Sequence, residues 1–434
     1  MQAAVVLPVL LFVVVWLIRG ARSAFVGILL PSLVLLPAYY TWKLPGIPVV
    51  TFHNYLVAVG FVALICARIS TGLRPALTDL LVIVGAAFAF SSEWSNANLH
   101  EARNLGAMIL MLGLAPYGIG RLVASSDGLL IACIGALTLL GAGVGFASVF
   151  EARMGSNPFD FWRGRWPGSV PWDGALYRAG IRRCAGPFAH PICAGFFFSM
   201  LLPLWAWLAD RKLPFRSLQR ILLGAGLLLG LLTSVSRGPM LGAVIGLMIM
   251  RVGWSRWRLP IAALALTTGL FGSVLAADKV QGYLSVTRMD AKTESQETAA
   301  YRTEMLSNYL EVVQEQPWQG FGRYQVPVIK GQKSIDNQYL FLTLQYGLPH
   351  ALLFLLALLT PACLLAWRLA WTPVTDPHGR LGWAIVGLLF GAMGTLTTVF
   401  AGTQTAQILL LMQGMAVTLT GRIARPADRG AYSQ

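Results

Sequence analysis

The chain has 434 residues, of which 56% are hydrophobic and 12% charged, and its mean hydropathy is +0.64. A soluble domain carries about a quarter charged residues, so this composition excludes an ordinary soluble protein and predicts an all-α polytopic membrane protein. The net charge of +15 would suit a nucleic-acid-binding protein, but the basic residues gather between apolar runs. We therefore expect membrane lipids, and no nucleic acid, around the chain.

Apolar runs comparable to the roughly 20 residues needed to cross a bilayer recur along the whole chain. Adjacent runs with almost no linker, such as the last two, could form short hairpins, so the expected number of transmembrane helices is about 12–13. The thirteen candidate spans are residues 5–18, 24–40, 50–67, 76–90, 105–120, 128–150, 188–209, 221–234, 239–250, 259–276, 339–367, 381–401 and 404–419.

Basic residues are distributed unequally between the two sets of short loops. Seventeen of the 33 Lys and Arg fall in one set, and only three, Lys43, Arg103 and Arg237, fall in the opposite set. The positive-inside rule places the seventeen in the cytoplasm, and both long loops on the other side. The predicted parts are N-terminal transmembrane helices (1–150), a first outer loop (151–189), central transmembrane helices with a Ser-Arg-Gly turn (190–277), a large outer loop or lid (278–337), and C-terminal transmembrane helices with a cytoplasmic tail (338–434).

The first outer loop is rich in aromatic and basic residues. Flat aromatic faces pack against the C–H edge of a sugar ring, and they also let a loop lie on lipid headgroups, so both interpretations stay open. The loop ends at His190, which is either a proton acceptor near neutral pH or a local hydrogen-bond partner that orients the turn. The aromatic and basic residues are Phe159, Phe161, Trp162, Trp166, Trp172, Tyr177, Arg163, Arg165, Arg178, Arg182 and Arg183.

The eighth and ninth spans meet at a short turn, Ser234-Val-Ser-Arg237-Gly-Pro239. Only sixteen residues separate Arg220 from Arg237, so we expect Arg237 at or below the level of the headgroups. An arginine at that depth is costly unless it meets an anion or lines a wet cavity; alternatively, it reaches up to lipid phosphate. Pro239 begins the next helix and leaves free N–H groups near Arg237. The turn therefore predicts a phosphate site.

The second outer loop holds eight of the eighteen Asp and Glu of the chain. Residues 299–316 are predicted to form an amphipathic helix, because Leu306, Leu310 and Val313 fall at helical spacing. Pro317 ends this helix. A large ordered loop between apolar spans is where a membrane protein usually keeps its selectivity or its chemistry, so we interpret the loop as the lid of an active site.

Three motifs, in this order, resemble the O-antigen ligase and polymerase superfamily of bacterial envelope glycosyltransferases (the Wzy/WaaL group). The first is similar to an Arg-x-x-Gly element of the family, the second to its Ser-Arg-Gly turn, and the third to its outer domain and exit. Together they cover residues 183–348, whereas the first six spans match only in hydropathy. The motifs are Arg183-x-x-Gly186-Pro-Phe-x-His-Pro191, Ser236-Arg237-Gly238-Pro239, and Arg302 followed by Pro317-x-x-Gly320-x-Gly322, Asp336-Asn337-x-Tyr339-Leu340 and Tyr346-Gly347-Leu348.

The resemblance implies a GT-C-like glycosyltransferase in the bacterial inner membrane that acts at the periplasmic face. It implies a glycan donor on undecaprenyl pyrophosphate, a glycan acceptor, and an inverting transfer that needs no metal or other cofactor; a chain-length regulator is a candidate partner. Fixed guanidinium groups would stabilise the pyrophosphate as the C–O bond breaks. The residues implied in substrate binding are Arg183, Arg237, Arg302, Arg323, Asn337 and Tyr339.

Three residues are candidates for the base that deprotonates the acceptor hydroxyl. Asp336 is favoured, because it follows the lid and immediately precedes a span, although Asp at that place also commonly caps a helix. His190 lies at another span entrance and could fill the same role. Glu304 lies about 200° around the helix from Arg302, so it is expected to point away.

The exit motif distinguishes two activities within the superfamily. Ligases usually carry His-Asn there, whereas this chain has Asp336-Asn337, and its Gly-Pro-Phe-x-His-Pro element is more similar to the polymerases. We therefore favour an O-antigen or exopolysaccharide polymerase, with a ligase to lipid A core as the alternative. A lipid-linked oligosaccharide transporter fits less well, because such proteins have repeated halves and ionisable groups near the midplane.

Overall fold

The computed structural model describes residues 1–67, 73–160, 162, 165–166, 176–178, 180–211, 217–265, 267–268, 294–332 and 334–423. Its strands form two short antiparallel hairpins, β1 (Thr41–Trp42) with β2 (Val50–Thr51) and β3 (Tyr177–Arg178) with β4 (Ile181–Arg182). Its helices are η1 (Gln2–Val6), α1 (Leu7–Arg19), α2 (Ala21–Ala24), η2 (Phe25–Leu29), α3 (Leu30–Leu35), α4 (Asn54–Cys66), α5 (Leu77–Asn96), α6 (Leu99–Ile109), η3 (Leu110–Leu114), α7 (Ala115–Val123), α8 (Asp127–Met154), α9 (Pro191–Asp210), α10 (Ser217–Thr233), α11 (Arg237–Gly253), α13 (Glu294–Glu315), α14 (Gln338–Ala370), α15 (Pro377–Leu396) and α16 (Thr403–Arg422).

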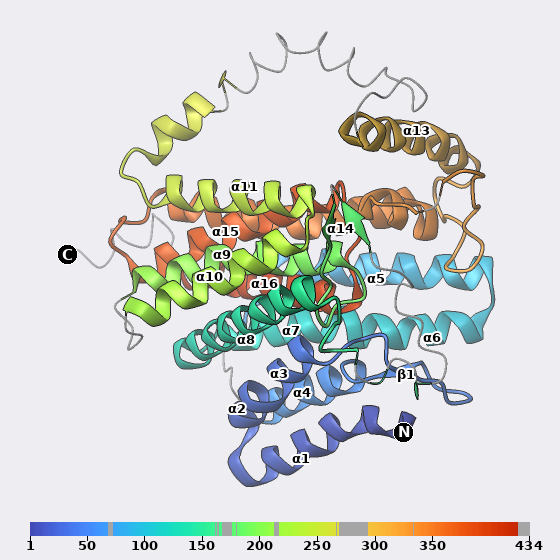
Figure 1. The fold of residues 1–434 in the computed structure, drawn as a ribbon, viewed down its shortest axis with the longest axis horizontal. Helices are drawn as coiled ribbons and strands as arrows, with labels where there is room; N and C mark the ends of the chain where they lie inside the picture. The colour runs from blue at the N-terminus through green and yellow to red at the C-terminus, as the bar shows by residue number, and fades with distance from the viewer. Residues whose placement is uncertain are drawn as a thin grey trace.

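The helices form one bundle in which most of them run along a common direction (Figure 1). In the described part of the chain, seven helices are long and apolar enough to cross a membrane, and shorter apolar helices accompany them. This confirms the all-α polytopic membrane class. Each predicted span overlaps a helix; in the span 259–276 the helical residues are 259–265 and 267–268, and the rest lie outside the described residues. The number of crossings, 12–13, stays a prediction.

Glycines hold α11 directly against α15. Gly242 and Gly246 face Gly391 and Gly387, and a Cβ atom on any of them would collide with backbone of the other helix. Small residues four apart are what lets two membrane helices approach closely. The contact fixes the beginning of α11, and with it Arg237, against the end of α15.

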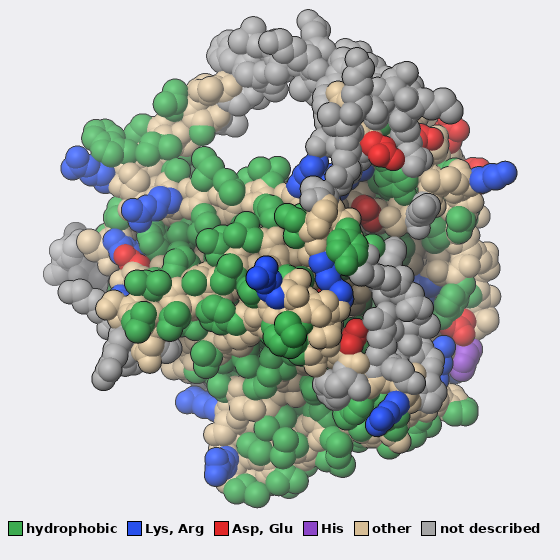
Figure 2. Space-filling model, in the orientation of Figure 1, with side chains coloured by type: hydrophobic (Ala, Val, Ile, Leu, Met, Phe, Trp, Pro, Cys, Tyr) green, Lys and Arg blue, Asp and Glu red, His purple; other side chains and the backbone are tan. Residues whose placement is uncertain are grey.

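The two outer loops emerge at the same end of the bundle. In Figure 1 the loop before α9 and the helix α13 lie at one end, whereas α9, α11, α14 and α16 finish at the other. Hydrophobic side chains cover the helices between these ends, and most of the visible acidic side chains lie at the end that carries α13 (Figure 2). The bundle is therefore polar on the side where both loops gather.

The sequence predicted the position of the lid helix α13 correctly, but it predicted its buried face only in part. Leu306 and Leu310 are 43% and 49% exposed, whereas Met305 and Tyr309 are only 2% exposed. Met305 and Tyr309 pack in a small core with residues of α14 such as Leu344. The two stripes lie side by side on one helix, and the Met305 and Tyr309 side chains fill the space against α14. Val313, the third residue of the predicted stripe, is half-buried and packs against this core, so the prediction was wrong for the two leucines only.

Two aromatic residues of the first outer loop, Trp162 and Trp166, have a third role. Trp166 is 4% exposed and stacks on Trp162, and both rings contact Tyr40 and Phe52. The Trp166 Nε1–H donates to the Thr41 carbonyl over 2.8 Å. These two tryptophans therefore form a core that anchors the loop to β1 and β2. Neither sugar stacking nor headgroup contact is needed to explain them. Phe161 and Trp172 lie outside the described residues.

Candidate active site

The turn between α10 and α11 joins two short helices and is strained. Each helix has 17 residues, which span about 25 Å, less than the roughly 30 Å of a bilayer core. Val235 in the turn has a φ of +46°, a left-handed conformation that costs a non-glycine residue about 1–2 kcal/mol. Ser234 and Ser236 beside it are buried, and the exposed Arg237 begins α11. Such strain persists only where the surroundings hold the backbone in place.

Arg183 is the residue that holds this turn. Its Nε donates to the Ser234 carbonyl over 3.2 Å and its Nη2 donates to the Ser236 hydroxyl over 2.9 Å. Ser236 in turn donates to the Ser234 carbonyl, and the backbone N–H of Cys184 donates to Thr233. The structure thus brings the first two predicted arginines, Arg183 and Arg237, to the same turn. Arg183 uses two of its hydrogen-bond donors to hold the turn that carries Arg237.

The loop between α15 and α16 contacts both Arg302 and the turn that carries Arg237. The Arg302 Nη2 donates to the Thr398 carbonyl over 3.4 Å. A Cβ atom on Gly238, next to Arg237, would collide with the Thr398 hydroxyl, so the beginning of α11 lies directly on this loop. Only glycine permits that approach. Thr398 therefore lies between the lid arginine and the Ser-Arg turn.

The electrostatics of Arg302 identify its charged neighbours. Burial lowers the pKa of the Arg302 guanidinium, the positive charges of Arg178 and Arg237 lower it further, and the Asp336 carboxylate opposes them. Positive charges that a fold holds close together repel one another, and a bound anion relieves this repulsion. Arg178, from the β3–β4 hairpin, was noted only as one basic residue among many in its loop.

The sequence left open whether Asp336 caps α14 or acts as a base, and the structure shows that its neighbour Asn337 is the cap. The Asn337 Oδ1 accepts from the backbone N–H of Leu340 over 3.1 Å, so Asn337 caps α14. The Asp336 Oδ1 instead accepts from the Ser334 hydroxyl over 2.9 Å, and Ser334 is held by the Tyr301 hydroxyl of the lid. The Asp336 carboxylate is therefore oriented by the lid, and helix capping does not occupy it.

His190 caps α9. Its Nδ1 accepts from the backbone N–H of Ile192 over 3.1 Å, a bond that assigns the proton of the neutral ring to Nε2. Burial lowers the pKa of His190 to about 4, and the nearby Arg183 adds to this effect. A ring that is neutral and protonated on Nε2 can donate a hydrogen bond but cannot take a proton there. This geometry favours the structural interpretation of His190 over its role as a base.

The other predicted residues lie apart from the arginines or have structural partners. The Arg323 Nε donates to Glu93 over 2.9 Å and its Nη2 to Glu101 over 3.2 Å. The Tyr339 hydroxyl donates to the Met393 carbonyl over 3.1 Å and so ties α14 to α15. Glu304 is exposed on the outer face of α13, as its angle to Arg302 predicts. We therefore do not include Arg323, Tyr339 or Glu304 in the candidate site.

Within the described residues, no group of three or more His, Cys, Asp or Glu could hold a metal ion. What converges is a set of guanidinium groups with one carboxylate. Guanidinium donors bind phosphate oxygens in a fork geometry, and a carboxylate accepts a proton. The site can therefore hold a diphosphate beside a hydroxyl group. Sequence reasoning missed Thr398, because its importance arises from a backbone carbonyl that carries no sequence signal.

Comparison with known families agrees with the motifs. Residues 222–355 match the family model described as O-antigen ligase, which is a little under a third of the chain. The match includes Arg237, Arg302 and Asp336 and begins after Arg183 and His190. No curated protein matches the chain significantly. The match over residues 222–355 therefore supports the resemblance to the O-antigen ligase and polymerase superfamily.

Proposed function

We propose that the chain is a glycan polymerase that joins repeat units carried on undecaprenyl pyrophosphate. The observation that carries the proposal is the meeting of Arg237 and Arg302 beside the carboxylate of Asp336, at the end where both outer loops gather. The family match supports an O-antigen ligase or polymerase type of activity, and the choice between the two types is our inference.

The site supports a single displacement at the anomeric carbon. Arg237 and Arg302 bind the pyrophosphate, and Arg183 fixes the turn that aims Arg237. An acceptor hydroxyl attacks the anomeric carbon while its proton passes to Asp336. The bond from that carbon to the pyrophosphate oxygen breaks, and undecaprenyl pyrophosphate leaves with the electron pair. Guanidinium groups already in place stabilise the charge that develops on the leaving oxygens. The anomeric configuration is inverted, and no metal is required.

A ligase that transfers the finished glycan to lipid A core is the second candidate, favoured by the description of the matching family. Ligases use a histidine at the exit motif, where this chain has Asp336. The capping bond of His190 also makes that histidine a poor replacement. A base built from a carboxylate on the lid is therefore the reason why we favour the polymerase.

The unequal distribution of basic residues supports a periplasmic site, because seventeen of 33 lie in the loops at the opposite side. Val328, in the second outer loop, is 86% exposed and suits a labelling test. In a variant without native cysteines, Val328→Cys should react with an impermeant maleimide in cells whose outer membrane alone is permeabilised. Reaction only after the inner membrane is opened would contradict this orientation.

The direct test is a reaction of the purified protein in nanodiscs with a lipid-linked repeat unit, with and without lipid A core, and with excess EDTA. A ladder of products without the core, unchanged by EDTA, is the expected result. A single transfer that needs the core would identify a ligase. Loss of activity on chelation, with rescue by magnesium, would contradict the metal-independent mechanism. Arg237→Ala serves as the inactive control.

A further inference from the structure

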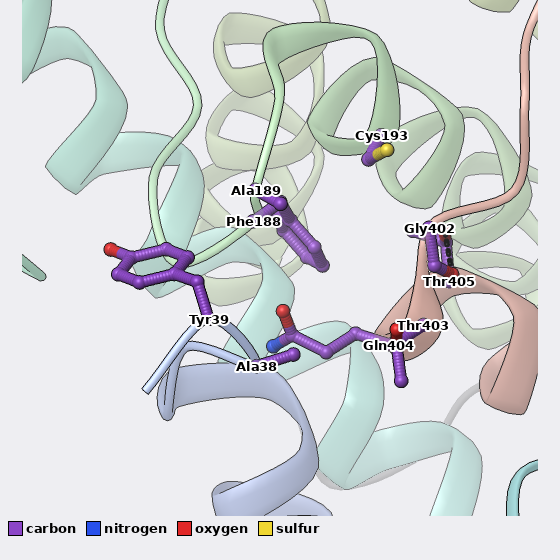
Figure 3. A pocket seen from close by; sticks show the side chains of 9 residues that line it. All are labelled: Ala38, Tyr39, Phe188, Ala189, Cys193, Gly402, Thr403, Gln404 and Thr405. Atoms are coloured by element: carbon purple, nitrogen blue, oxygen red, sulfur yellow. Dashed lines mark hydrogen bonds between the residues drawn. The ribbon is translucent and has the colours of Figure 1, made fainter. Parts of the chain in front are cut away.

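A cavity lies outside the set of residues assigned to the candidate active site. It has a volume of about 200 Å³ and lies where three segments meet: the chain after α3, the entrance to α9 and the first turn of α16 (Figure 3). Its walls include the rings of Tyr39 and Phe188, the small side chain of Ala189, and the polar side chains of Thr403 and Gln404. The mechanism described above uses none of these groups.

The lining has the chemistry of a site for a neutral, hydroxyl-bearing ring. None of the described residues that line it is charged, so it does not repeat the phosphate site. The Gln404 Nε2 donates to the carbonyls of Leu33 and Leu36 over 3.1 and 3.0 Å, which fixes the amide. Its Oε1 remains an acceptor, and Figure 3 shows this oxygen on the side of Phe188. An oriented amide oxygen accepts from a sugar hydroxyl, and an aromatic face packs against sugar C–H groups.

The cavity is joined to the active site by one short loop, residues 397–402. The Thr398 carbonyl of this loop accepts from Arg302 over 3.4 Å, and the backbone N–H of Ala401 donates to Gln338 over 2.7 Å. The last residue of the loop, Gly402, lines the cavity. Gln338 follows Asp336 by two positions, so this loop connects the cavity wall at Gly402 with the segments that carry Arg302 and Asp336.

The size of the cavity limits what it can hold. Its volume is roughly seven times the ~30 Å³ that one water occupies in the liquid, and it lies below the ~300 Å³ at which sites for drug-sized ligands begin. One sugar ring fits such a space. The bound ring would be held in a fixed orientation by Gln404.

We propose that this cavity is a sugar subsite that binds a single ring of the repeat unit; this rests on the proposed glycan transfer and deepens it. The ring belongs either to the donor or to the acceptor, since both carry the same hydroxyl chemistry. A subsite for one ring would determine which sugar is accepted, because an unfilled amide acceptor rejects an analogue that lacks the matching hydroxyl.

Two substitutions test the subsite without disturbing the core. Ala189 is exposed and lines the cavity, so Ala189→Leu fills it from the open side, and Thr403→Val removes a hydroxyl at nearly constant shape. Ala97→Leu is the matched control, because Ala97 is exposed but lies at the end of α5 outside the cavity. Binding is measured by calorimetry in nanodiscs with two probes. The first is a set of oligosaccharides released by acid from the surface polysaccharide of the producing bacterium, and the second is inorganic pyrophosphate.

For Ala189→Leu we expect oligosaccharide binding to weaken at least about tenfold, and for Thr403→Val about three- to tenfold, the range for one lost hydrogen bond. Pyrophosphate binding should be unchanged in both, whereas Arg237→Ala should show the reverse pattern. Oligosaccharide binding that is equal in Ala189→Leu and Ala97→Leu would overturn the subsite. Because this assay needs no turnover, its outcome is independent of whether the protein proves to be a polymerase or a ligase.

Whether the bound ring belongs to the donor or to the acceptor can be determined by measuring the transfer reaction with a free oligosaccharide as acceptor. If the acceptor occupies the cavity, Ala189→Leu raises the half-saturating concentration of the oligosaccharide and leaves that of the lipid-linked donor unchanged. If the donor occupies it, the donor concentration shifts instead. Both results support a sugar subsite. A decrease in maximal rate with neither concentration changed would overturn it.

Discussion

The Asp336→Asn variant tests whether Asp336 acts as the catalytic base or only supports the fold. The variant keeps an oxygen that can accept from the Ser334 hydroxyl, a bond of 2.9 Å in the wild type, so the local structure should persist. What disappears is the ability to take a proton and one negative charge near Arg302. Loss of a general base typically costs about 10²–10⁴ in rate. We therefore expect transfer to fall by that factor while the apparent melting temperature remains within a few degrees of the wild-type value.

Donor binding should change in the opposite direction. Removal of a carboxylate beside guanidinium groups leaves the pyrophosphate in a more positive site. The gain is at most about fivefold in affinity, since a partly exposed charge pair contributes about 0.2–1 kcal/mol. Single-turnover transfer and calorimetric binding of the lipid-linked donor measure the two effects. Ser334→Ala is the matched control, because it removes the partner and keeps the carboxylate. Near-normal transfer by Asp336→Asn, or a parallel loss of donor binding, would refute the role of Asp336 as the base.

Three further predictions concern the arginines and His190. Arg237→Ala should reduce transfer by about 10²–10³, and Arg237→Lys should recover little, because an ammonium group lacks the guanidinium fork; near-normal polymer at equal expression would contradict the phosphate site. Arg323→Met should lower stability by about 3–5 kcal/mol, because it leaves Glu93, whose side chain is 0% exposed, without its 2.9 Å partner; in that variant, lost transfer at unchanged melting temperature would instead indicate substrate binding. Burial lowers the pKa of His190 from 6.5 to about 4. As the pH drops, His190 is therefore protonated in the unfolded chain before it is protonated in the folded protein. The free energy of unfolding should fall by about 3 kcal/mol between pH 6.5 and pH 4. His190→Asn keeps a helix cap and should lose less stability than the wild type between pH 7 and pH 4.5 in thermal denaturation; equal losses would show that other groups dominate.

The sequence by itself determined the membrane class, the position of nearly every described helix and the two outer loops. These properties depend on the solvation of each segment separately, since a run of apolar residues is stable in a bilayer whatever its neighbours are. The motifs also predicted a site that includes Arg183, Arg237, Arg302 and Asp336 before any contact was known. Their order along the chain resembled a family, and residues 222–355 match that family.

Only the tertiary structure decided which residues are partners. Arg323 and Glu93 are 230 positions apart, and no local pattern indicates that they pair. Asn337 caps α14 and leaves Asp336 to the lid, although either residue is a good cap by type. The face of α13 that is buried depends on the shape of α14, and the loop at Thr398 acts through backbone atoms. Packing between distant segments assigns these roles, because hydrogen bonds and close contacts depend on positions in space that hydropathy does not encode.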